Sequence, residues 1–290
     1  ARQDPASGST DGAATDDGLV RRTRPARPRT DDRPSVAVVA WDVGHNPLGR
    51  ANVLAEVLAR RFDVELWGAQ FPRYGNQVWE PMGDIPTPVN VFTGSTFPEH
   101  LATMEAVAGR MDADAVWVSK PRFPALGLGI LAKQARNRPL VVDVDDHELA
   151  FFAEDEALGL PELLALDRDE LEWPFERAWT RACDPFIGDA DAVTVSNPAL
   201  QDRYGGVIVP HARDETVFDP DSVDRWAVRA ELGIPEEERL LLFGGTPRAH
   251  KGVVEILEAL ERIGDDRHRV LVFGTRELDE LRESIGDLTR

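Results

Sequence analysis

Short apolar runs alternate with amphipathic stretches from Ser35 onward. The runs that predict buried strands are Val36–Trp41, Val64–Trp67, Ala115–Val118, Leu140–Val144, Ala192–Val195 and Val207–Val209. Between them, apolar residues recur with helical spacing over Arg50–Phe62 and again from Pro124 to about Arg136. Strands that alternate with helices predict a parallel sheet covered on both faces, and binding residues in such sheets lie at the carboxyl ends of the strands.

Two regions depart from this pattern. Residues 1–34 are rich in small, polar and proline residues and have almost no large apolar ones, so we expect them to be disordered. Phe151–Phe186 is acidic and carries Trp173 and Trp179. This composition predicts helices that pack on the edge of the sheet.

A second strand–helix series begins near Glu236. The predicted elements are a strand at Leu240–Phe243, a helix at Lys251–Ile263, a strand at Val270–Phe273 and a helix at Arg276–Ile285. Two strands make too small a sheet for a doubly wound domain. We therefore expect this chain to hold only the first part of a second domain.

The junction inside this second series is the most informative stretch, RLLLFGGTPRAHKGVVEILEAL at Arg239–Leu260. The adjacent glycines Gly244 and Gly245 allow close approach of the backbone, and a helix N-terminus presents unpaired N–H groups and the positive end of a dipole. Arg248 and Lys251 add full charges. The pattern predicts a phosphate site; the alternative is a plain turn with a solvated lysine.

This junction resembles the start of the second domain in family 4 glycosyltransferases of the GT-B fold. There a strand, a glycine turn and a Lys-Gly pair hold the diphosphate of a sugar nucleotide. Upstream, VIVPHARDETVFDP (Val207–Pro220) resembles the interdomain linker of that family, and Arg229–Pro235 matches its Arg-x-x-x-Gly-Ile-Pro lead-in. This sequence departs from the family in that Thr246 stands where the family has arginine. The later strand–helix units of the second domain, which carry the family's Glu-x7-Glu signature, are also absent from it.

The resemblance implies an α/β protein of the GT-B type, with two Rossmann-like parallel-sheet domains that face a cleft and with the second domain incomplete in this chain. It divides the chain into a disordered N-terminal segment (1–34), an acceptor domain (35–210), an interdomain linker (211–235) and the first part of a nucleotide-sugar-binding domain (236–290). The donor diphosphate is expected to bind at Gly245, Thr246, Arg248 and Lys251.

The activity implied is that of a retaining glycosyltransferase of the hexosyltransferase type. It would move a sugar from a UDP- or GDP-sugar co-substrate to a hydroxyl of a saccharide, lipid or small molecule, in cell-envelope or polysaccharide biosynthesis. No permanently bound cofactor is implied. Two alternatives stay open: a GT-B sugar-nucleotide epimerase, and a degenerate module that binds without catalysis. An NAD-dependent enzyme is disfavoured because the first strand–helix turn lacks a compact G-x-G-x-x-G.

Three loops of the first domain carry the other candidates. Asp146 and His147, in DVDDHE at residues 143–148, are the predicted catalytic residues, since imidazole titrates near neutrality and can move the proton of an acceptor. The same letters resemble the metal-binding DxD of GT-A enzymes, but the GT-B pattern favours no metal; helix capping is the remaining alternative.

Candidates for the acceptor follow the first strand and a later one. His45, Gly49 and Arg50 lie in the loop DVGHNPLGR, for which a turn and helix start is the alternative interpretation. Lys120 lies in SKPRFP, which is otherwise a solvated loop.

Composition narrows the partners. The formal net charge of −19 disfavours nucleic acid, whose phosphates would be repelled. The single cysteine excludes an internal disulfide and favours a reducing, cytoplasmic setting, with peripheral contact to the inner face of a membrane left open. The apolar runs are too short to span a bilayer.

Overall fold

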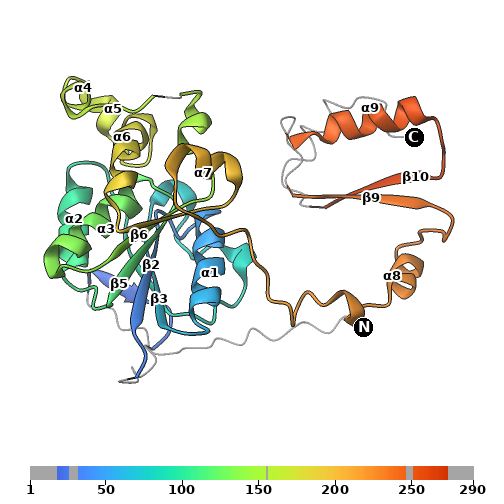
Figure 1. Cartoon of the computed structure of the whole chain (residues 1–290), viewed down its shortest axis with the longest axis horizontal. Coiled ribbons are helices and arrows are strands. Elements are labelled where there is room, and N and C mark those ends of the chain that lie inside the picture. Colours follow the sequence, from blue (N-terminus) through green and yellow to red (C-terminus); the bar gives the residue numbers. More distant parts are fainter. Residues whose placement is uncertain (1–17, 26–31, 155, 246–250, 274–290) are drawn as a thin grey trace. The chain divides into compact units, whose positions relative to one another are not determined.

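The computed structural model describes residues 18–25, 32–154, 156–245 and 251–273. The chain divides into two compact units, residues 1–213 and 214–290 (Figure 1). The first is built on a large sheet and the second on a two-stranded one.

Unit 1 contains an eight-stranded sheet in the order β1-β4-β3-β2-β5-β6-β7-β8. The strands are β1 (Val20–Arg22), β2 (Ser35–Ala40), β3 (Asp63–Gln70), β4 (Val89–Thr93), β5 (Ala115–Ser119), β6 (Leu140–Val144), β7 (Ala192–Val195) and β8 (Val207–Ile208). All the neighbouring strands pair in parallel except β1, which runs antiparallel to β4. The chain builds outward from β2 first through β3 and β4 and then through β5 to β8, so the strand order reverses between β2 and β5.

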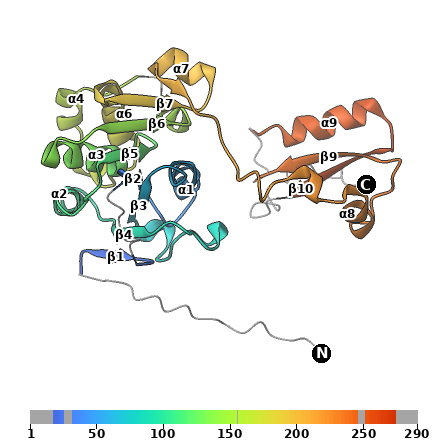
Figure 2. The same ribbon diagram turned by 60° about the horizontal axis from the view of Figure 1, so that its bottom comes forward.

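Helices cover both faces of this sheet (Figure 2). The longer ones are α1 (Pro47–Leu58), α2 (Glu99–Ala108) and α3 (Phe123–Arg136). One apolar cluster joins α1 to one face, and a larger cluster joins α2 and α3 to the other. The shorter helical elements are η1 (Pro72–Tyr74), η2 (Glu80–Met82), η3 (Glu148–Phe152), α4 (Leu160–Leu164), α5 (Arg168–Leu171), α6 (Arg177–Cys183), η4 (Asp184–Asp189) and α7 (Pro198–Tyr204).

The two-sided cover explains the sequence of β2. All six of its residues, SVAVVA, are buried. Val36 and Val38 belong to the cluster around α1, whereas Ala37 and Val39 belong to the cluster around α2 and α3. A strand buried on both faces reads as a continuous apolar run, because neither face alternates with solvent.

Unit 2 holds a parallel pair of strands, β9 (Arg239–Gly244) and β10 (His268–Phe273). Helix α9 (Val253–Ile263) packs on them through the buried Val253, which lies in one cluster with Phe243. The unit begins with η5 (Pro220–Ser222) and α8 (Arg225–Glu231).

The structure departs from the sequence-based expectations in several places. The predicted disorder of residues 1–34 is wrong for Val20–Arg22, because backbone pairing with β4 needs little apolar composition. The unpredicted strand β4 contains a buried Asn90, whose amide donates to Glu65 and to the carbonyl of Leu66.

The first helix begins at Pro47 rather than Arg50, since proline suits the first helical turn. Three further helices, α2, α7 and α8, had no sequence prediction. The helix predicted at Arg276–Ile285 lies outside the described residues. Within the described ranges, no helix has both the length and the apolar character needed to cross a membrane.

Candidate functional site

The reversal of strand order places the candidate site at the carboxyl ends of β2 and β5. At such a point the connections from the two neighbouring strands leave toward opposite faces and open a crevice between them. The loop after β2 carries Asp42 and His45, and the loop after β5 carries Lys120 and Arg122. Candidate residues from different parts of the sequence are thereby brought to one edge of the sheet.

Asp42 and His45 form an oriented pair. The carboxylate of Asp42 is fully buried; its Oδ1 accepts the backbone N–H of Gly44 at 2.6 Å and lies 2.8 Å from Nδ1 of His45. Its Oδ2 accepts the backbone N–H of Phe71 at 2.8 Å. Because an ionised carboxylate only accepts, Nδ1 carries the proton of the neutral ring and Nε2 is its basic nitrogen.

Aromatic rings hold the other side of this imidazole. His45 stacks on Tyr74 with ring centroids 3.7 Å apart and an interplanar angle of 9°. It meets Trp41 in an edge-to-face contact with ring centroids 4.8 Å apart. Phe175 packs against both Trp41 and Tyr74. Burial raises the pKa of Tyr74 above its usual value. The ring of His45 is thus fixed in orientation while its side chain stays about a quarter exposed.

The ammonium group of Lys120 lies among the carboxylates of the segment DVDDHE, residues 143–148. Its Nζ is 2.8 Å from Asp145 Oδ1, 2.6 Å from Asp146 Oδ2 and 3.5 Å from Glu148 Oε1. Although burial opposes the charge, these carboxylates raise the pKa of Lys120 above its usual value. The three carboxylates are close enough to hold one metal ion, but the ammonium group occupies the place that a cation would take.

Arg122 connects this acidic cluster to the aromatic one. Its Nε donates to Glu148 Oε2 at 2.6 Å and its Nη1 donates to the carbonyl of Phe175 at 3.1 Å. The guanidinium carbon lies 5.1 Å from the centre of the Trp41 ring, within the range of a cation–π contact. The predicted residues Lys120 and Asp146 therefore share one charge network that reaches the surroundings of His45.

Two other predicted residues of unit 1, Arg50 and Gly49, are enclosed by neighbouring groups. The guanidinium of Arg50 is buried in a double contact with Asp143, and it also donates to the carbonyls of Val209 and Pro210. Gly49 lies inside α1, where an added Cβ would meet the ring of Trp79 at 3.5 Å. Their roles in acceptor binding stay predictions.

His147 comes just before η3 and is half-buried. Its Nε2 is buried, and no described residue hydrogen-bonds to it. The ring lies 6.5 Å from that of Tyr204. Its predicted catalytic role, like that of Asp146, stays a prediction.

The predicted diphosphate site lies in unit 2, at the end of β9. Gly245 has φ of +129° and Gly252 has φ of +80°, both in the range that favours glycine. A Cβ on Gly245 would lie 3.9 Å from Nζ of Lys251, so this ammonium faces the glycine turn. Lys251 is exposed and directly precedes the N-cap of α9. Thr246 and Arg248 lie outside the described residues.

Sequence reasoning missed the partners that orient His45. Asp42 directly follows the first apolar run, and an acidic residue at a strand end is a usable signal. Tyr74 and Phe175 carry no such signal, because they come from segments that meet β2 only in the folded chain.

No protein-family model matches this chain, and no curated protein matches it. Solved structures do. A glycosyltransferase from Rickettsia africae aligns with 89% of this chain and 66% of its own, at a TM-score of 0.56 and 12% identity. The chain has the GT-B fold.

Two plant enzymes align less closely. A UDP-glucosyltransferase from Polygonum tinctorium aligns at a TM-score of 0.48 and 12% identity, over 90% of this chain and 70% of its own. Phytolacca americana UGT2 aligns at a TM-score of 0.46 and 14% identity, over 86% of this chain and 73% of its own. The Rickettsia africae structure, at 12% identity, shows the fold alone, so the predicted fold class is confirmed and the narrower assignment to family 4 stays a prediction.

Proposed function

We propose that this chain belongs to a glycosyltransferase that moves a sugar from a nucleotide-sugar donor to a hydroxyl of an acceptor. The observation that carries the proposal is the His45–Asp42 pair at the reversal point of a GT-B sheet. It offers a basic nitrogen whose orientation is held by a buried carboxylate and a stacked ring. Unit 1 binds the acceptor in this proposal, and unit 2 binds the donor.

Each unit supplies one part of the chemistry. The acceptor oxygen forms a bond to the anomeric carbon of the donor sugar, and the bond from that carbon to the diphosphate oxygen breaks. The acceptor proton passes to Nε2 of His45. The departing diphosphate carries negative charge, which the ammonium of Lys251 and the backbone N–H groups at the start of α9 stabilise.

The stereochemical course has two candidates. The sequence resemblance predicts retention at the anomeric carbon. Inversion is favoured by His45, because single displacement at the face opposite the leaving group needs a base on the attacking hydroxyl, and this imidazole is placed as one. NMR of the first-formed product distinguishes the two outcomes through its anomeric coupling constant.

The donor assignment is tested by calorimetry on the full-length gene product with UDP, GDP and ADP, each with and without magnesium. We expect saturable binding of one nucleotide without metal. Lys251→Ala should weaken that binding roughly tenfold or more, the loss of one charge-assisted contact. Arg262→Ala, which removes an exposed charge from the far end of the same helix, is the matched control.

The base assignment is tested by His45→Gln and Asp42→Asn. Both variants should lower transfer by about 10²-fold or more with nucleotide affinity unchanged, since both residues belong to unit 1 and the proposed donor site belongs to unit 2. Full turnover in His45→Gln would overturn the base role. Nucleotide binding without transfer to any acceptor would favour the degenerate module, and a changed donor sugar without acceptor would favour an epimerase.

The pathway and the location rest on the sequence alone. We propose a cell-envelope or polysaccharide acceptor and a cytoplasmic setting, with peripheral membrane contact as an open alternative. Fractionation of cells that express the native gene tests the location.

A further inference from the structure

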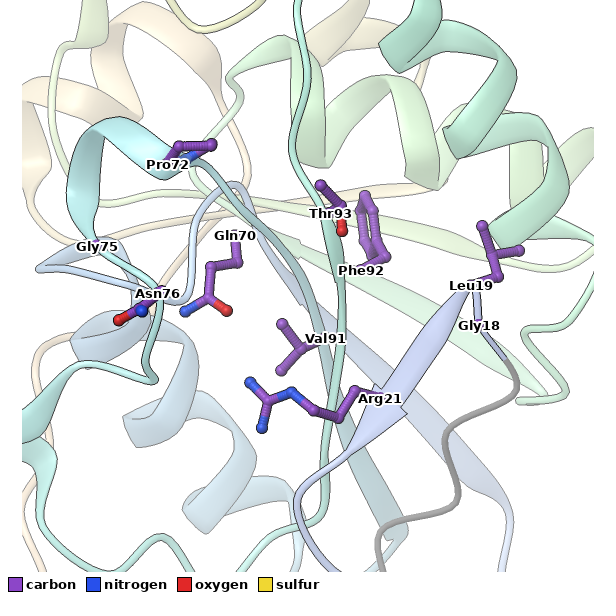
Figure 3. Close-up of a pocket in the computed structure, with 10 residues that line it drawn as sticks. All are labelled: Gly18, Leu19, Arg21, Gln70, Pro72, Gly75, Asn76, Val91, Phe92 and Thr93. Atoms are coloured by element: carbon purple, nitrogen blue, oxygen red, sulfur yellow. The ribbon is translucent and has the colours of Figure 1, made fainter.

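A pocket of about 550 Å³ opens where β1 joins the sheet, and none of the candidate site residues described above is among those that line it (Figure 3). Gln70 and Thr93, the last residues of the parallel strands β3 and β4, lie at its edge. The residues that line it are Gly18, Leu19, Arg21, Gln70, Pro72, Gly75, Asn76, Val91, Phe92 and Thr93. Strand β1, the antiparallel addition to an otherwise parallel sheet, thus supplies one wall.

Two polar groups in this pocket lack partners within the described part of the chain. No described residue hydrogen-bonds or ion-pairs with the guanidinium of Arg21. The Nε2 of Gln70 is buried, and it too has no hydrogen-bond partner among the described residues. Figure 3 shows both groups pointing into the same space beside Val91. Because a buried donor left unpaired costs about 1–3 kcal/mol, such groups call for an explanation.

Arg22, the next residue of β1, shows that an arginine on this strand can find side-chain partners. Arg21 pairs with Val91 across the ladder and Arg22 pairs with Asn90, so the two side chains leave opposite faces of the sheet. Arg22 donates to Asn90 Oδ1 at 2.8 Å and lies 3.2 Å from Glu65. On its own face, Arg21 meets Val91 and the space of the pocket.

The lining has the chemistry of an anion site. It contains a positive charge and amide donors, and none of its residues is an aspartate or glutamate. The whole chain has 52 acidic and 33 basic residues, so an uncompensated cation in a hollow is unusual here. Leu19, Pro72, Val91 and Phe92 add an apolar surface beside the donors. Pockets of this size hold small organic molecules.

We infer that this pocket binds a small organic oxyanion, a molecule with an apolar body and a carboxylate or phosphate head. The guanidinium of Arg21 takes the head in a two-point contact, and Nε2 of Gln70 donates to one of its oxygens. The apolar body lies on Val91 and Phe92. This site goes beyond the proposed sugar transfer and does not depend on it, because it needs neither His45 nor the donor.

Titration of the chain with benzoate, phenyl phosphate and the neutral benzyl alcohol, followed by ligand-observed NMR, tests the inference. We expect at least one anion to bind roughly tenfold more tightly than the alcohol, the value of one charge-assisted contact. The comparison of benzoate with phenyl phosphate shows which head the pocket prefers.

Matched variants locate the binding. Arg21→Gln should weaken the preferred anion roughly tenfold, and Gln70→Leu should weaken it several-fold, each with an unchanged melting temperature. Arg24→Gln is the control, because it removes the same charge from the same segment but from a side chain that is paired with Asp84. The affinity of this variant for the preferred anion should stay within about twofold of wild type. Equal affinity in Arg21→Gln and wild type, or no anion binding at about 10 mM, would overturn the inference.

Discussion

Arg50 and Asp143 join the first helix of unit 1 to the end of β6 through two parallel hydrogen bonds. Nε of Arg50 lies 2.9 Å from Oδ2 of Asp143, and Nη2 lies 2.9 Å from Oδ1. Both side chains are almost wholly buried, and Thr194 donates to the same carboxylate at 2.6 Å. Burial opposes the charge of Arg50, yet the contacts with Asp143 raise its pKa above the usual value.

Removing one partner of this pair should destabilise unit 1. In Arg50→Met the carboxylate of Asp143 stays buried without its cation, and we expect a loss of about 3–5 kcal/mol of unfolding free energy in urea titrations. The double variant Arg50→Met with Asp143→Leu should recover most of that loss, because no buried charge is then left unpaired. If Arg50→Met unfolded like wild type, the pair would have no structural role.

Lys120 should be needed for stability in the same way. We expect Lys120→Met to lose about 3–5 kcal/mol at pH 7, since it leaves the carboxylate of Asp145 buried without its cation, whereas Glu148 keeps its contact with Arg122. Burial already raises the pKa of Asp145, so acid protonates this group more readily than an ordinary aspartate and the deficit should shrink as the pH is lowered. Lys133→Met, which breaks an exposed pair with Asp191, should cost about 1 kcal/mol or less.

The same variant tests the relation between Lys120 and metal binding. With the ammonium removed, the carboxylates of Asp145, Asp146 and Glu148 remain close enough to share one ion. Calcium or magnesium should therefore raise the melting temperature of Lys120→Met more than that of wild type, because binding to the folded state stabilises it. An equal response of both proteins to the metal would contradict this account of the cluster.

His100 should make the stability of unit 1 depend on pH. Burial lowers its pKa to about 4, from 6.5 for an ordinary histidine. Below about pH 6.5 the unfolded chain takes up a proton that the folded chain refuses, so stability falls as pH drops toward 4. The contribution is about 3 kcal/mol across this range. Urea titrations of wild type and His100→Gln at several pH values should show a steeper loss in wild type; parallel curves would refute this assignment.

Two glycines on α3 should respond differently to alanine. A Cβ on Gly129 would lie 2.5 Å from Cγ2 of Val118, a side chain of the buried strand beneath the helix. We expect Gly129→Ala to lower the unfolding free energy by about 1–3 kcal/mol through overpacking. On Gly127 the nearest atom would be 3.3 Å away on the ring of Phe123, so Gly127→Ala should change stability less. Thermal unfolding of the two variants makes the comparison.

Much of the fold could be predicted because its strands are short apolar runs. The run at Val36–Trp41 became β2, buried on both faces, and the run at Leu140–Val144 became β6. Strand β1 escaped prediction because Val20 is its one buried apolar residue, while its backbone pairing with β4 depends on a partner about 70 residues away. Local pattern reports which side chains can be buried, and it does not report which backbone lies beside them.

For the candidate site, too, the sequence determined the local features and the tertiary structure determined the contacts. The sequence alone determined the strand–helix alternation, the glycine turn before Lys251 and the loops that carry His45 and Lys120, since these depend on neighbouring residues. The tertiary structure decided what those side chains contact. It seated Lys120 among three carboxylates and held His45 between Asp42 and Tyr74. It also left the guanidinium of Arg21 without a hydrogen-bond or ion-pair partner among the described residues. Charge and ring contacts depend on distances across the fold, and those distances exist only once the strands are in register.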